Sequence, residues 1–245
     1  MVTLLAGGAI TDNNGAAMNV TADSLLVTAV GGSLGPEGNL YLGGETWGIL
    51  GAVEGTYVAG EHLDVFLLSY ERGGFAARWS RQLHTHAPSA LQYLGGALAV
   101  SGDGAVYQAA TGFMDPFVAF KLFRFEAGGR PTWTRAAGWG SYLARGPDAP
   151  ILAVDPRGHV FVAGVTWGGV QESTEGAPRT TGDPANFLIS YDAAGGRRWS
   201  RQFSTDAFSE AVIAAGGEDE GYLAAQSPGW PARVLLARVL PGASP

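Results

Sequence analysis

The chain has 245 residues, of which 38 are glycine, none is cysteine and only 15% are charged. The lack of cysteine excludes disulfides, thiolate metal sites and a cysteine nucleophile. The net charge of −7 has the wrong sign for a protein that binds nucleic acid or an anionic membrane surface. Frequent glycine predicts many tight turns and therefore short strands.

The first predicted strand is an apolar segment near the N-terminus, residues 2–11. It has no basic residues before it and is too short to span a bilayer, so it does not resemble a signal peptide or a membrane anchor. After a polar segment, residues 24–83 contain a group of predicted strands separated by glycine-rich or irregular segments. These strands are residues 25–30, 39–44, 64–70 and 78–83.

The same order of strands returns along the chain. A second copy spans residues 95–136, with its third strand predicted at residues 117–120, and a third copy spans residues 149–203. The words Trp-Ser-Arg-Gln and Phe-Leu-x-Ser-Tyr occur in both the first and the third copy. A fourth, shorter copy spans residues 209–240 and has no Trp-x-Arg strand. Such self-similarity indicates a repeat protein.

A repeat of about 40–60 residues with four strands is typical of one propeller blade. The sequence therefore predicts an all-β fold, a single β-propeller domain over residues 1–245 with four-stranded antiparallel blades. We expect four blades, with residues 2–10 supplying the outer strand of the last blade by pairing with residues 233–239. This closure would remove two unpaired edges. Two alternatives stay open: an open half-ring of four units that pairs with a second chain, and a sandwich with coincidental similarity.

The third copy shows the unit most clearly. An inner strand runs into an Asp-x-x-Gly turn at residues 154–158, and Val-Phe-Val-Ala-Gly follows at 160–164. Phe-Leu-Ile-Ser-Tyr-Asp then stands at 187–192 and Gly-Gly-x-x-Trp-Ser at 195–200. This unit resembles the SBBP (seven-bladed β-propeller) repeat family, although the chain carries four units. The resemblance implies a bacterial surface or exported protein and brings no catalytic motif.

Motifs for catalysis and cofactor binding are missing from the sequence. The only lysine, Lys121, lies in an apolar strand rather than in a phosphate loop, and no Gly-x-Ser-x-Gly elbow occurs. Asp103 and Asp155 stand in turns, where aspartate binds backbone amides, and residues 218–220 form an acidic turn. The sequence thus predicts no catalytic residue, no cofactor and no metal.

The candidate binding residues are aromatic, histidine and arginine side chains in the long segments between strands. In a four-stranded blade these segments leave from one face, and amphipathic rings in such loops are typical of recognition surfaces. His84 and His86 would need a third ligand, such as His62 or Asp206, to bind a metal; otherwise they are solvated loop histidines. Packing of the loops over the propeller face is the alternative. The predicted residues are Trp47, Tyr57, His62, His84, His86, Trp139, Tyr142, Trp167 and Arg179.

Trp79, Trp133 and Trp199 recur at equivalent positions and are predicted to pack between blades. With no catalytic constellation, we expect a non-catalytic binding or scaffold module of a cell-surface, exported, virion or filament assembly. Its partner would be a protein or a glycan, in an extracellular or cell-surface location, with a homo-oligomer possible as well. The alternatives are a carbohydrate-active enzyme (glycosidase or lyase) and a purely structural subunit that polymerises.

Overall fold

The structure is a computed structural model, and its described part consists of strands and the short turns that join them, with no helix. The described residues are 2–6, 25–46, 53–54, 64–72, 76–83, 92–113, 120–137, 151–166, 185–203, 210–216, 220–226 and 234–239. The strands form four sheets that follow one another along the chain. The predicted all-β class is confirmed.

The first sheet contains the N-terminal strand and the first repeat. Its order is β1-β2-β3-β5-β6-β4, and all its pairs are antiparallel except β4 with β6. The strands are β1 (Val2–Ala6), β2 (Leu25–Leu34), β3 (Leu40–Thr46), β4 (Val53–Glu54), β5 (Asp64–Tyr70) and β6 (Ala77–Leu83). We call β2, β3, β5 and β6 unit one.

The second and third sheets have four antiparallel strands each, and the fourth has three. Unit two is β7 (Gln92–Val100), β8 (Val106–Phe113), β9 (Phe120–Phe125) and β10 (Pro131–Ala137). Unit three is β11 (Ile151–Val154), β12 (Val160–Thr166), β13 (Ala185–Tyr191) and β14 (Arg197–Phe203). Unit four is β15 (Glu210–Ala215), β16 (Gly221–Gln226) and β17 (Val234–Val239).

One edge of every unit is closed by short turns. After β11, the amide of Asp155 donates to the carbonyl of His159 and that of Gly158 to the carbonyl of Asp155. The same pair of bonds closes the turns after β7, β9 and β13. The fourth residue has positive φ in each, 83° for Gly158, which explains the glycine. We call this side the short-turn edge. The longer connections leave from the opposite side, the long-connection edge.

The units pack face to face through three apolar clusters. One joins units one and two and contains Tyr41, Leu67 and Phe125. The next joins units two and three, where the rings of Phe120 and Phe187 stack 5.5 Å apart. The last joins units three and four through residues such as Leu223. The first strands contact one another in chain order, β2 with β7, β7 with β11 and β11 with β15.

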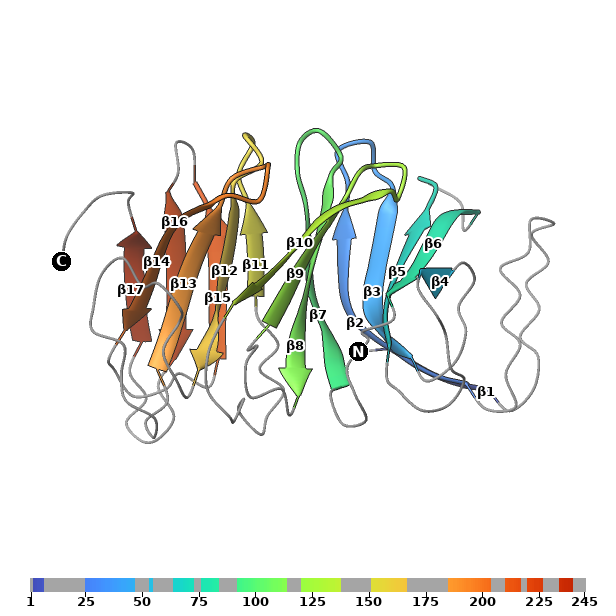
Figure 1. Ribbon diagram of the computed structural model, residues 1–245, viewed down its shortest axis with the longest axis horizontal. Coiled ribbons are helices and arrows are strands. Elements are labelled where there is room, and N and C mark those ends of the chain that lie inside the picture. Colours follow the sequence, from blue (N-terminus) through green and yellow to red (C-terminus); the bar gives the residue numbers. More distant parts are fainter. Residues whose placement is uncertain are drawn as a thin grey trace.

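The units stand in a row along the long axis of the molecule. Figure 1 shows β17 near one end of this axis and β6 near the other, with units two and three between them. Each sheet presents both of its faces to neighbours except at the two ends of the row. The core therefore consists of successive layers between sheets.

The expected closure of a ring by the N-terminal strand is wrong. Instead of pairing with residues 233–239, β1 pairs with β2, with Val2 opposite Ala29 and Ala6 opposite Leu25. Strands that are close in sequence pair at a lower cost in loop entropy than strands at the two ends of a chain. Among the described residues the outer edge of β17 has no partner strand.

Two further differences concern strand positions. The sequence predicted a third strand of unit two at residues 117–120, whereas β9 spans Phe120–Phe125. In β9 the partly exposed Lys121 and Arg124 stand between buried residues. Because these charged residues interrupt the apolar run, the sequence did not predict the strand at its correct position. The second difference is β4, a short strand within a segment predicted to be irregular, which pairs in parallel with β6.

Candidate functional site

The predicted binding residues all lie outside the described residues. They are Trp47, Tyr57, His62, His84, His86, Trp139, Tyr142, Trp167 and Arg179. The structure does describe the strand ends to which the segments with these residues are attached.

These strand ends belong to one edge of the row. Trp47 follows Thr46, the last residue of β3, and Trp167 follows Thr166 at the equivalent end of β12. His84 follows Leu83 at the end of β6. Because neighbouring strands are antiparallel, the second and the fourth strand of a unit end on the same side. The sequence-predicted residues are therefore attached at the long-connection edge.

A buried polar cluster lies at this edge of unit one. The carboxylate Oδ2 of Asp64 accepts a hydrogen bond of 2.6 Å from Nε2 of Gln82. Both side chains are buried, as is Thr46, which lies opposite Asp64 in the register of β3 and β5. A buried, hydrogen-bonded pair fixes the ends of β5 and β6. Sequence reasoning missed this pair, although an aspartate that opens an apolar strand signals a polar partner.

Unit three lacks the same pair. Ala185 stands at the position of Asp64, and Asn186 stands at the position of Val65. The side chain of Asn186 is only 3% exposed, and its Nδ2 has no hydrogen-bond partner. Such buried orphan groups are rare and costly. The signal in the sequence is an amide residue at the start of an otherwise apolar strand, and it was missed too.

The short-turn edge has a structural role instead. Nε1 of Trp79 donates to the carbonyl of Ala127 at 2.9 Å, and Nε of Arg81 donates to the carbonyl of Gly129 at 2.7 Å. The turn after β9 is thus held by unit one. We call this contact the Trp-Arg latch.

The latch recurs between units two and three. Trp133 donates to the carbonyl of Ala193 at 3.1 Å, and Arg135 donates to the carbonyl of Gly195 at 2.5 Å. The recurring tryptophans were predicted to pack between blades, and the contacts across the sheets confirm that they pack between units. Trp199 is 7% exposed and lies against Phe161, but its Nε1 has no hydrogen-bond partner.

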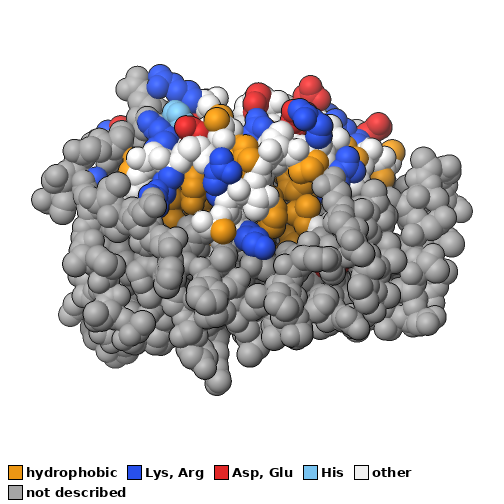
Figure 2. Space-filling view, in the orientation of Figure 1, with side chains coloured by type: hydrophobic (Ala, Val, Ile, Leu, Met, Phe, Trp, Pro, Cys, Tyr) orange, Lys and Arg blue, Asp and Glu red, His pale blue; other side chains and the backbone are white. Residues whose placement is uncertain are grey.

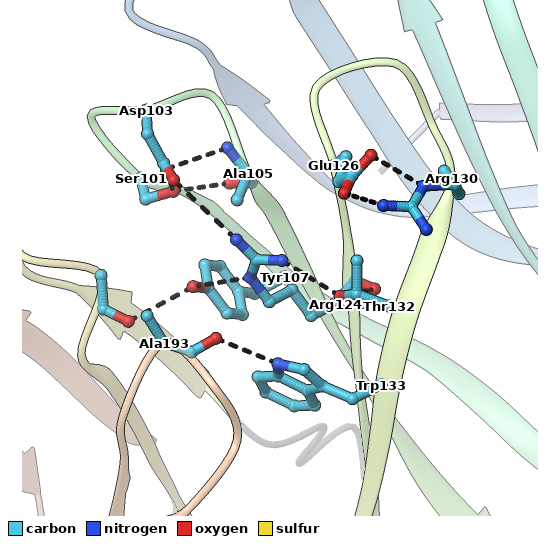
Figure 3. A network of polar contacts seen from close by, with 11 residues as sticks. Ser101, Asp103, Ala105, Tyr107, Arg124, Glu126, Arg130, Thr132, Trp133 and Ala193 are labelled. Carbon is cyan, nitrogen blue, oxygen red and sulfur yellow. Dashed lines mark hydrogen bonds and ion pairs between the residues drawn. The ribbon is translucent and has the colours of Figure 1, made fainter.

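A polar network surrounds the second latch, as Figure 3 shows. The hydroxyl of Tyr107 donates to the carbonyl of Gly158 in unit three at 3.3 Å and accepts from Nε of Arg124. Arg124 also lies 3.8 Å from the carboxylate of Asp103. Figure 2 shows acidic and basic side chains of the described residues along this edge of the molecule.

Three carboxyl groups of this edge, those of Asp103, Glu126 and Glu220, have lowered pKa values. The hydroxyl of Ser101 donates to Asp103 and, with the amide of Ala105 and the charge of Arg124, lowers the pKa of that carboxyl. Hydrogen bonds from Arg130 lower the pKa of Glu126, and those from Arg238 and Tyr222 lower the pKa of Glu220. A carboxylic acid that delivers a proton near neutral pH needs a raised pKa instead.

Two observations concern other kinds of site. Within the described ranges, no three histidine or acidic side chains gather into a group that could hold a metal ion. The same ranges contain no helix long and apolar enough to cross a membrane.

The comparisons with known proteins do not supply a relative. No family model matches the chain, and no curated protein matches it. The resemblance to the SBBP repeat family stays a prediction.

Proposed function

We propose that the chain is a non-catalytic binding or scaffold module whose contact surface is the long-connection edge. The observation that carries the proposal is the direction of the strands, which places the short turns at one edge and the long connections at the other. The short-turn edge is occupied by hydrogen-bonded turns and latches between units. The other edge carries the long segments with the loop aromatics. Loops on a rigid scaffold can vary without cost to the fold, so we assign partner recognition to the edge that carries the long segments.

The arrangement of the units also belongs to this proposal. Units one to four are propeller-type blades, because each has its strands in consecutive antiparallel order and the first strands contact one another in succession. The blades form an open half-ring of four rather than a closed one. Four open blades remain similar to the SBBP repeat family, without closure of a ring by the N-terminal strand.

The chemistry of the described residues favours binding over catalysis. The carboxylates of Asp103, Glu126 and Glu220 have lowered pKa values and arginine partners. None of these three is suited to act as a general acid in glycoside cleavage. The partner is a protein or a glycan in a cell-surface, exported, virion or filament assembly, which the resemblance suggests. Aromatic side chains would provide most of its binding energy.

Photo-crosslinking in the native assembly tests the proposal. A photoreactive phenylalanine analogue replaces Trp47, Trp139 or Trp167 in three variants. In matched controls it replaces Glu37 or Arg157, which are exposed on the short-turn edge. We expect crosslinks to the partner from the first three variants and none from the two controls. Crosslinks found mainly from the short-turn edge would show that the proposed contact surface is wrong.

A further inference from the structure

The two ends of the row expose large apolar side chains. Leu34 in unit one is 69% exposed, and Val212 and Tyr222 in unit four are 66% and 36% exposed. They are the large hydrophobic residues that stand out as exposed within the described part of the chain. Apolar side chains gathered on an exposed face mark an interaction surface more often than scattered ones do.

Leu34 occupies a position that is packed in the following units. It is the last residue of its first strand and lies opposite Leu40. Val100 lies opposite Val106 in the same way, and Val154 lies opposite Val160. Val100 and Val154 both pack against the cluster that joins their unit to the preceding one. Leu34 therefore lies on the face that unit one would turn to a preceding unit.

Other residues of this face of unit one show the same contrast. Leu40 and Leu42 are partly exposed. At the equivalent positions of unit three, Val160 and Val162 are completely buried against unit two. This face of unit one thus carries apolar residues like those buried between units two and three. Among the described residues no further sheet covers it.

Tyr222 occupies the complementary position. It lies opposite Ala214 in the register of β15 and β16. The rings at this position in units one, two and three belong to Tyr41, Tyr107 and Phe161, which are at most 1% exposed and sit on the face that turns to the following unit. Tyr222 thus lies on the face of unit four that would meet a following unit.

Val212 completes this second face. In unit three its counterpart is Ile151, which lies opposite Ala163 as Val212 lies opposite Ala224. Ile151 packs against the cluster that joins units three and four. Units one and four therefore present the two halves of one junction, and Figure 1 shows these units at opposite ends of the molecule.

We propose that the chain associates head to tail with a second copy of itself, unit four of one copy packing on unit one of the next. Tyr222 and Val212 would contact Leu34 and Leu40 of the second copy. This would repeat the junction between units two and three, where Tyr107 belongs to the apolar cluster and Val154 packs against it. The two faces differ, so the interface is heterologous and generates either a ring or a filament. This inference rests on the open arrangement of the units, which belongs to the proposed function, but not on the choice of the long-connection edge as the contact surface.

Single charges placed on each face test the inference. Leu34→Glu blocks the unit-one face, Val212→Glu blocks the unit-four face, and Ala194→Glu on the exposed short-turn edge is the matched control. Sedimentation velocity over a range of concentrations measures the association. Since burying an unpaired charge is unfavourable, we expect each blocking substitution to weaken it at least about tenfold. The control should associate like the parent chain.

A mixture of the two blocked variants separates this interface from a symmetric one. Each variant keeps one intact face, so the mixture should form dimers while each variant alone stays monomeric. Association of a single blocked variant with itself would contradict a heterologous interface. A parent chain that stays monomeric at all concentrations would overturn the proposal.

Disulfide trapping distinguishes association between copies from closure within one chain. The sequence has no cysteine, so Leu34→Cys combined with Tyr222→Cys gives one possible pair. We expect a ladder of linked copies on oxidation, which reduction removes. A linked monomer would instead show that unit four folds back on unit one of the same chain, and the absence of any link would also overturn the inference. Pro156→Cys with Tyr222→Cys is the control pair and should not link.

Discussion

At the scale of single residues, one contact occurs between units one and two and again between units two and three. A tryptophan and an arginine in the fourth strand of one unit donate hydrogen bonds to two backbone carbonyls. Both carbonyls lie in the turn between the third and fourth strands of the following unit. The indole lies directly on the glycine of that turn, so a β-carbon on Gly129 would come within 2.6 Å of the Trp79 ring. The left-handed backbone and the close approach of the ring both require glycine there.

Replacing this glycine should therefore be costly. We expect Gly129→Ala to lower the free energy of unfolding by about 2–4 kcal/mol, from the left-handed backbone and the displaced indole together. The neighbouring Gly128 is the matched control, because a β-carbon there meets nothing within 4 Å. Gly128→Ala should stay within about 0.5 kcal/mol of the parent. Urea unfolding measures both, and equal values for the two variants would refute the latch.

A buried tyrosine predicts how stability depends on pH. Burial raises the pKa of Tyr191 to about 12 from its ordinary 10.0, although Arg197 and Arg135 act against the rise. The folded state thus favours the neutral phenol. The contribution of the Tyr191 phenol to the free energy of unfolding is complete below pH 10. It is lost as the pH rises from 10 towards 12, because the phenol ionises at a lower pH in the unfolded chain than in the folded one.

Tyr191→Phe should remove this loss. Thermal unfolding between pH 9 and pH 12 would show a smaller decrease in melting temperature for the variant than for the parent chain. Tyr107, whose pKa burial also raises, keeps part of the effect in both proteins. Identical decreases in the two proteins would show that Tyr191 titrates as it does in the unfolded chain.

Single residues were predictable where a rule of local backbone or repetition applied. The Asp-x-x-Gly word at residues 155–158 predicted a turn with glycine at the left-handed position, and the structure confirms it. The repeated tryptophans predicted packing. The partners of Trp79 and Arg81 were not predictable, since they are backbone carbonyls in another unit and leave no mark in the sequence. For the candidate binding residues, sequence reasoning gives the edge of attachment and no geometry.

At the scale of elements, the strands of units one and three followed from their apolar runs. The position of β9 did not, because charged residues interrupt its buried positions. The partner of β1 did not follow either, because several apolar edges are equivalent in sequence alone. The edge with which β1 pairs depends on the length of the connecting segment and its entropy cost. The shorter connection favours pairing with β2 over pairing with a strand at the C-terminal end.

Deleting residues 1–6 tests this pairing. We expect faster amide exchange in the segment of β2 that pairs with β1, around Val27–Ala29, and unchanged exchange in β17. The loss of hydrogen-bonded partners on one edge of β2 is the reason. Faster exchange in β17 with an unchanged β2 would restore the ring closure that the structure contradicts.

At the scale of the whole molecule, the chain is a row of sheets held by apolar layers between faces and by latches at one edge. We propose that a partner binds the other edge and that further copies pack on the two ends. Whole-molecule order was predictable from the repeat, because similar units stack on their neighbours. Whether the row closes was not, since closure depends on small rotations between units that the sequence does not record.

The measurement that tests this architecture most directly is a set of spin-label distances by double electron–electron resonance. Because the chain has no cysteine, labels attach selectively at introduced cysteines, and spin dilution with unlabelled chain removes distances between copies. One label stays at Glu37 in unit one, and the second is placed at Gly102, Arg157 or Arg238 in units two, three and four, all exposed positions. An open row predicts that the distance increases from each unit to the next. A distance from unit one to unit four as short as that from unit one to unit two would show a closed ring and contradict the account.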